Sequence, residues 1–357
     1  MRRGLMSWSP EEMPVAVLDE RVARLQTAMQ KENLAAVLVY TSFAQPAAVH
    51  WLTNFTPYWS EALLVVMPEG VPVLLAALTQ RVHGWIREVA HLSNVISAPR
   101  LGEGAQVLLD QQGVHISERI GVVGLDSLPW SLGSVLIKDR QDGQLVDVSE
   151  LFAAMRQPGD SAELTLARRA AAIGKNALAA APQHAQSTSE LAAVLEASAR
   201  LAGAEEVLQR VAPDLQRNAA LVRLEGELPL GSAYAVELSL AYKGVWVRMG
   251  CSFSRTETEP SWKAAEEWFA NSIAGLSQAD QWQPAPAPGI LTRWSLETST
   301  GLHPLSVVAA SDSKAVSKLP AGSLAVFSAH LENDGGHWFR SAPVVLGKVG
   351  VPGKLLI

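Results

Sequence analysis

An acidic and a basic side chain, Glu237 and Arg248, stand on the two strands of a β-hairpin that is predicted within residues 231–256. Small or polar residues alternate with apolar ones along residues 233–241, the period of two of a strand with unlike faces, and residues 245–253 return as the second strand. A carboxylate can ligate a metal ion, whereas a guanidinium cannot, because it is always charged and has no lone pair to offer. The hairpin therefore offers one possible cation ligand and one anion-binding group, or a structural ion pair between its strands.

The same hairpin carries the only cysteine of the chain, Cys251. A single cysteine excludes an intramolecular disulfide and suits a reducing compartment. No base flanks Cys251 in the sequence, so we expect a small core side chain and not a reactive thiol.

Helices alternate with short apolar strands in the first half of the chain. The pattern predicts helices over residues 18–32, 79–89 and 103–111, and strands over residues 35–40, 49–55, 62–67, 71–75, 120–123 and 144–148. Strands that are apolar throughout need cover on both sheet faces, so we expect an α/β domain here.

A second domain is expected after Pro158 and Gly159, which break the chain. We therefore predict domains over residues 1–157 and 158–357. The second domain is predicted to hold helices over residues 162–181, 187–202 and 260–276 and, besides the hairpin, strands over residues 208–212, 219–224, 305–309, 323–330 and 342–346. Ser187 and Glu190 have the spacing of a capping box at the start of the second of these helices.

Composition narrows the classes of partner. The 357 residues carry a net charge of −6 without a run of Lys or Arg, so we expect no nucleic-acid and no membrane partner. No apolar run reaches the roughly 18 residues that span a bilayer. Prolines and acids interrupt residues 6–18, which do not form a signal peptide, and we expect a cytoplasmic protein.

The order of several motifs resembles the creatinase, aminopeptidase P and prolidase family, whose catalytic domain has the pita-bread fold. The resemblance is carried by residues 24–55, 62–78, 119–129, 146–178, 231–256 and 319–327, which are distributed along nearly the whole chain. It implies a creatinase-type N-terminal α/β domain followed by an α+β pita-bread domain. It also implies the family's usual homodimer.

The resemblance implies which positions of this sequence correspond to the family's metal ligands, and most residues at those positions cannot bind a metal ion. Metal-dependent members hold two divalent ions with two Asp, one His and two Glu. In this sequence the corresponding positions are Glu237, Arg248 (or Ser252 after a short insertion), a site one residue from His303, Ser328 with His330 nearby, and Arg340. At most two of five ligands remain, so we expect no dinuclear metal site and no other cofactor.

Creatinase itself works without metal, with a His as acid/base and glutamates that hold a cationic substrate. The resemblance places Val222 and Arg223 where that His should stand, so the chain fits this enzyme no better. It further implies a cluster that faces the cleft, made of Arg223, Glu237, Arg248, His303, His330 and Arg340. Such a pocket would be basic and would prefer an anion such as a carboxylate. Arg248 and Arg340 are expected to converge in it.

The leading hypothesis is therefore binding of a small anionic molecule or peptide end in the former active-site cleft, without metal hydrolysis. One alternative is a metal-independent amide or amidine hydrolase with His303 or His330 as base. Others are a residual metallopeptidase and a structural subunit that pairs with an active relative. The simpler interpretations are that both histidines are core or surface residues and that Arg223 and Arg340 are solvated. Trp51, Trp59 and Trp338 could line an aromatic pocket.

Overall fold

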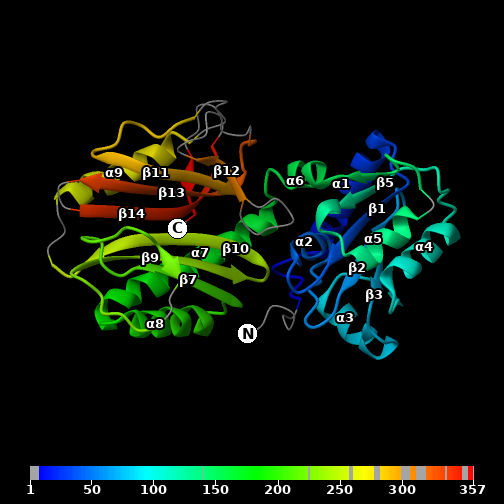
Figure 1. Ribbon diagram of the computed structural model, residues 1–357, viewed down its shortest axis with the longest axis horizontal. Helices are drawn as coiled ribbons and strands as arrows, with labels where there is room; N and C mark the ends of the chain where they lie inside the picture. Colours follow the sequence, from blue (N-terminus) through cyan, green and yellow to red (C-terminus); the bar gives the residue numbers. More distant parts are fainter. Residues whose placement is uncertain are drawn as a thin grey trace. The chain divides into compact units, whose positions relative to one another are not determined.

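The chain folds into two compact units that divide after Arg156. One unit contains the described residues up to Arg156 and the other contains those from Gln157 onward (Figure 1). The computed structural model describes residues 8–138, 140–223, 226–256, 260–276, 282–298, 306–310, 319–333, 336–347 and 353–356. None of the helices in these ranges is both long and apolar enough to cross a bilayer.

The N-terminal unit is built on a mixed sheet with the strand order β4-β3-β2-β1-β5-β6. The strands are β1 (Ala36–Thr41), β2 (Ala62–Val66), β3 (Val73–Ala76), β4 (Asn94–Ser97), β5 (Ile120–Val123) and β6 (Leu145–Asp147). The central strand β1 runs antiparallel to β2 and parallel to β5. Val37 and Val39 enter one core, whereas Ala36 and Leu38 enter another on the opposite face. The uniformly apolar strands are thus explained by cover on both faces.

Helices supply that cover. They are α1 (Val15–Glu32), α2 (Ala47–Thr53), α3 (His83–Val89), α4 (Leu101–Gln111), α5 (Trp130–Ile137) and α6 (Ser149–Met155). The core of α1, α2 and α6 lies on one side of the sheet, and that of α4 and α5 lies on the other (Figure 1). The expected α/β domain is confirmed.

The predicted strand over residues 49–55 is wrong, because this segment forms α2. Pro46 precedes the helix, and Asn54 ends it in the left-handed conformation with φ 64°. Nearly every α2 side chain is buried, so the run shows no helical periodicity and cannot be told from a buried strand by pattern.

The second unit contains one large sheet with the strand order β12-β11-β13-β14-β10-β9-β7-β8. The described strands are β7 (Glu206–Ala212), β8 (Val222–Arg223), β9 (Ala233–Tyr242), β10 (Val245–Ser254), β11 (Ile290–Thr298), β12 (Ser306–Ala310), β13 (Leu324–Asn333), β14 (Gly336–Val345) and β15 (Lys354–Leu355), which pairs with β14. The predicted hairpin is confirmed as β9 and β10, paired from Ala233 with Ser254 to Tyr242 with Val245.

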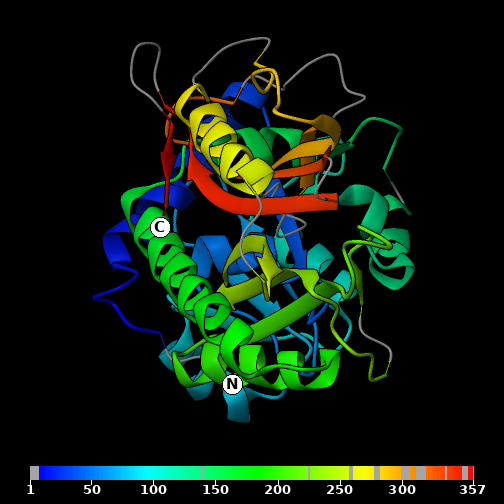
Figure 2. The ribbon, with the colours of Figure 1, turned by 90° about the vertical axis from the view of Figure 1, so that its left-hand side faces the viewer.

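Three helices pack against this sheet. They are α7 (Ser161–His184), α8 (Thr188–Leu201) and α9 (Pro260–Ala274). The Ser187 Oγ accepts a hydrogen bond from the Glu190 backbone N–H at 3.3 Å, so the predicted cap of α8 is present. The core of α7 and α8 includes apolar side chains of β9 and β10, and that of α9 includes side chains of β13 and β14 (Figure 2). Each half of the sheet therefore has its own helical cover.

Candidate functional site

One row of register partners crosses almost the whole sheet of the second unit. From β8 to β11 the row reads Arg223, Arg210, Glu237, Gly250, Ser341, Ser328 and Ser295. Directly opposed residues of antiparallel strands project to the same face. The alternate residues of β9, such as Val236 and Leu238, pack in the α7–α8 core. We call the face that carries the row the inner face.

Four charged residues form a chain of alternating sign on the inner face. The Arg210 Nε donates to Glu237 Oε1 at 2.7 Å, and the Arg248 Nε lies 3.7 Å from the same oxygen. Arg248 also pairs through Nη1 with Glu297 Oε2. We call Arg210, Glu237, Arg248 and Glu297 the charge chain. Glu237 and Arg248 therefore form an ion pair, as the structural alternative for the hairpin expected. This pair is part of a series of ion pairs that involves four strands.

Burial differs along the charge chain. The side chains of Glu237 and Glu297 are only 5% and 11% exposed, and that of Arg248 is 21% exposed. The Arg210 side chain is 48% exposed. The Arg248 Nε also donates to Ser239 Oγ at 3.1 Å, which fixes the guanidinium from a third direction. The central residues of the charge chain are thus largely shielded from water, whereas Arg210 at its end is exposed to solvent.

Gly250, in the middle of the row, has no side chain and so leaves space for the ring of Phe339. A Cβ at Gly250 would lie 2.6 Å from Phe339 Cε1, so the ring needs glycine at this position. The Phe339 ring also contacts the His330 imidazole, with ring centroids 4.6 Å apart. His330 and Phe339 are register partners on β13 and β14, two residues along the strands from the row pair Ser328 and Ser341, and therefore on the same face. The histidine therefore belongs to the inner face.

His330 is neutral at physiological pH. Burial lowers its pKa to about 4, and the nearby charges of Arg293, Arg210 and His337 add to the effect. Arg293 is exposed on β11 and is the register partner of His330. Within the described part of the chain Arg293 forms no ion pair. A neutral imidazole and an uncompensated guanidinium therefore lie next to each other.

The structure brings most of the expected site residues together. Glu237, Arg248, Ser328, His330 and Arg223 all lie on the inner face. Ser328 is buried, and its Oγ hydrogen-bonds with that of Ser341 at 2.8 Å. Arg223 is exposed on the edge strand β8. Their roles in ligand binding stay predictions.

Arg340 lies on the opposite face, so its expected convergence with Arg248 is wrong. The Cα partner of Arg340 is Cys251, and the guanidinium Nε lies 3.5 Å from Glu266 Oε2 on α9. Because neighbours along a strand project to opposite faces, a shift of one residue exchanges the two sides of the sheet. The resemblance of the sequence alone could not resolve that shift.

The side of the sheet that carries Arg340 has a small pocket of about 180 Å³, also lined by Lys175, Met249 and Cys251. Burial raises the pKa of the Cys251 thiol to about 11, with a smaller opposing effect of Arg340. The thiol therefore stays protonated at neutral pH. This agrees with the interpretation of Cys251 as an unreactive side chain.

The three tryptophan candidates fall outside the inner face. His303 lies outside the described residues. Trp51 and Trp338 are 3% and 1% exposed and belong to the two unit cores, so neither lines an aromatic pocket. Trp59 is 59% exposed on the N-terminal unit, where it stacks on Trp85 with ring centroids 6.0 Å apart.

The residues of the inner face do not fit a dinuclear metal site. The Glu237 Oε1 already accepts a hydrogen bond from Arg210 and faces Arg248, so two cations compete for the carboxylate. Arg248 and Ser328 occupy positions to which the resemblance assigns carboxylate ligands, and neither side chain is a carboxylate. No group of three or more His, Cys, Asp or Glu side chains that could hold a metal ion occurs among the described residues.

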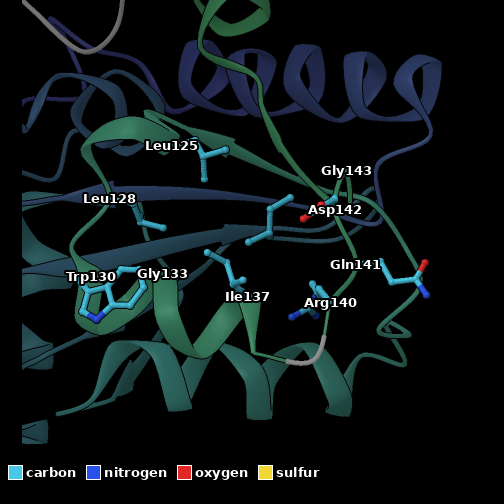
Figure 3. A pocket seen from close by; sticks show the side chains of 10 residues that line it. Leu125, Leu128, Trp130, Gly133, Ile137, Arg140, Gln141, Asp142 and Gly143 are labelled. Carbon is cyan, nitrogen blue, oxygen red and sulfur yellow. The ribbon is translucent and has the colours of Figure 1, made fainter.

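A different pocket, of about 360 Å³, lies in the N-terminal unit beside α5 (Figure 3). Its lining is mostly apolar and includes Trp130, which is 79% exposed, and Ile137, with Asp142 on the far side. The lining contains no His, Cys or Ser. The pocket could hold an apolar group, but it offers little chemistry, and the inner face is the stronger candidate.

A comparison with known protein families identifies the domain type of the N-terminal unit. Residues 21–157 match the creatinase/prolidase N-terminal domain. The N-terminal unit is therefore a creatinase/prolidase N-terminal domain. No curated protein sequence matches this chain.

Solved structures resemble the fold of both units. The X-Pro aminopeptidase from Thermotoga maritima MSB8 is 15% identical with a TM-score of 0.70, covering 94% of this chain and 96% of its own. The prolidase from Pyrococcus horikoshii OT3 is 14% identical with a TM-score of 0.71, covering 94% and 97%. The Xaa-Pro dipeptidase from Bacillus anthracis is 13% identical with a TM-score of 0.71, covering 95% and 97%. The predicted creatinase-type and pita-bread fold is thus confirmed.

Three charged residues of the inner face were not predicted from the sequence. Arg210 lay on a predicted strand, but its register with Glu237 was unknown. Arg293 and Glu297 lie on β11, which was not predicted. Polar residues alternate with Trp294 and Leu296 there, and that alternation could have revealed the strand.

Proposed function

We propose that the inner face binds the carboxylate of a small anionic molecule or of a peptide end, without a metal ion. The observation that carries the proposal is the position of Arg293, an exposed guanidinium beside the half-buried, neutral His330. Arginine presents a planar fork of donors that matches the two oxygens of a carboxylate. A peptide end is a suitable ligand, since the proteins of the same fold named above act on peptides.

The charge chain explains why the ligand would bind near Arg293. Arg248 lies between Glu237 and Glu297 and has no charge left for a ligand. Arg210 is bound to Glu237, but its side chain is half exposed and can turn a second edge toward solvent. The surplus positive charge around His330 therefore comes from Arg293 and Arg210, both of which lower the pKa of the imidazole.

The second candidate is metal-independent hydrolysis with His330 as general base. A neutral imidazole can accept a proton, which favours this function. With its pKa lowered to about 4, however, His330 is a weak base at pH 7, and general-base catalysis is most efficient when the pKa lies near the working pH. Carboxylate binding agrees better with this environment.

Thermal shift measurements with citrate, succinate and sulfate test the proposed function. Wild type should be stabilised by the carboxylates, and Arg293→Ala should lose most of that shift. Arg340→Ala is the matched control, because Arg340 lies on the other face and pairs with Glu266. Equal shifts in all three proteins would contradict the proposal. The homodimer and the cytoplasmic location stay predictions.

A further inference from the structure

We propose that the guanidinium of Arg248 serves as a resident cation of the inner face, bridging Glu237 and Glu297 as a divalent ion would, so that removing it opens a cation-binding site. The proposal goes beyond the function proposed above. It concerns the residues that do the work of a metal ion, and it does not depend on which ligand the face binds.

The geometry around Arg248 is that of a bridging cation. One edge of the guanidinium faces Glu237 Oε1, with the Nε 3.7 Å away, and Nη1 pairs with Glu297 Oε2. Ser239 supplies a neutral oxygen 3.1 Å from the Nε. Two carboxylates and a hydroxyl thus surround one positive group, and hard divalent ions also prefer oxygen ligands.

Position in the sheet distinguishes this arrangement from an ordinary cross-strand ion pair. Arg248 is on β10 and Glu297 is on β11, with β14 and β13 between them in strand order. The ladder between β10 and β14 consists of two register pairs, Gly250 with Ser341 and Cys251 with Arg340. Arg248 therefore links the two halves of the sheet where backbone pairing between them is short.

Charge makes the bridge necessary. Glu237 and Glu297 are nearly buried, and two such carboxylates near one cation repel each other once it is removed. Arg210 compensates only Glu237. The Arg248→Ala variant would thus keep one uncompensated carboxylate, a second one close by and free volume between them. A hard divalent cation fits that site. In the wild type the guanidinium is covalently attached to the protein, so it neither exchanges with dissolved cations nor is removed by a chelator.

The test compares wild type, Arg248→Ala and Arg248→Ala/Glu297→Gln by thermal unfolding and calorimetry. Each protein is measured in EDTA, in millimolar MnCl₂ or CaCl₂, and in NaCl of matched ionic strength. We expect wild type to show no divalent-specific shift. Arg248→Ala should melt several degrees lower in EDTA, recover part of that loss with Mn²⁺ or Ca²⁺, and bind one ion per chain. The double variant should lose the recovery.

Two results would overturn the proposal: a single variant that binds no divalent ion, or one that recovers equally in NaCl. If Arg248→Ala is unfolded in EDTA, circular dichroism in MnCl₂ decides in the same way, since refolding supports the bridge and its absence refutes it. Anion-dependent stabilisation of wild type is a separate measurement. A failure of the proposed carboxylate binding would therefore leave this result standing, and the reverse also holds.

Discussion

Arg248 on β10 forms an ion pair with Glu297 on β11, although β14 and β13 lie between the two strands in the sheet. Flat neighbouring strands are about 4.8 Å apart, so three strand intervals span about 14 Å, a distance that two side chains projecting from the sheet could bridge only if both lay fully extended along it. The sheet must therefore curve strongly around its inner face. That curvature brings the polar residues of both halves of the sheet together.

Removing the acid of this pair should destabilise the fold. We expect Glu297→Gln to lower the free energy of unfolding by about 1–3 kcal/mol, because the Arg248 charge would lose its buried partner. Urea denaturation measures the change. Glu196→Gln is a suitable control, since its pair with Arg200 lies on an exposed helix face and should be worth about 0.5 kcal/mol or less. Equal losses in both variants would contradict a buried link.

Arg293→Ala should weaken the binding of a small dicarboxylate by roughly 10- to 100-fold, the worth of a charge-assisted hydrogen bond of about 1.5–3 kcal/mol. Isothermal titration calorimetry on wild type and variant gives the ratio. Arg340→Ala, whose side chain lies on the other face, should bind as wild type does. A loss of the same size in Arg340→Ala would show that the ligand binds elsewhere.

His330 should make stability depend on pH in the acidic range. Its pKa is about 4 in the fold, below the ordinary histidine value of 6.5, so the unfolded chain binds the proton more tightly. Stability should therefore rise as pH increases from about 4 to 6.5, by at most about 3 kcal/mol, and be lost as pH falls. His330→Phe should flatten this part of the profile. NMR titration of the His330 ring checks the pKa directly, and a value near 6.5 would refute the prediction.

Gly250→Ala should destabilise the inner face. The added methyl would lie 2.6 Å from Phe339 Cε1 and 2.9 Å from Glu237 Cα, so the ring or the strand must shift. We expect a loss of about 1–3 kcal/mol in the free energy of unfolding, typical of overpacking. Gly84→Ala serves as a control, because Gly84 is helical and nothing lies within 4 Å of its added methyl. That control should be neutral or stabilising by up to about 1 kcal/mol.

Much of the fold could be predicted from local pattern. The β9–β10 hairpin follows from strict alternation, and the cap of α8 follows from the spacing of Ser187 and Glu190. Residues 49–55 failed because a short segment buried on all sides has the same composition as a helix and as a strand.

The candidate site was harder to predict, because it depends on register between strands far apart in the sequence. Glu237 and Arg248 could be assigned to one face, since they share a hairpin. Arg340 joins β10 only through long-range pairing, and a shift of one residue placed it on the wrong face. Glu297 reaches Arg248 through the curvature of the sheet, which no local pattern encodes.

The graded exposure of the charge chain has a consequence for its response to ionic strength. Dissolved ions screen charges that meet water and act weakly on buried pairs, and the Debye length at 0.15 M salt is about 8 Å. Arg210 is half exposed, whereas Glu237 and Glu297 are nearly buried. Added salt should therefore loosen the Arg210 contact first and leave the pair of Arg248 with Glu297 intact.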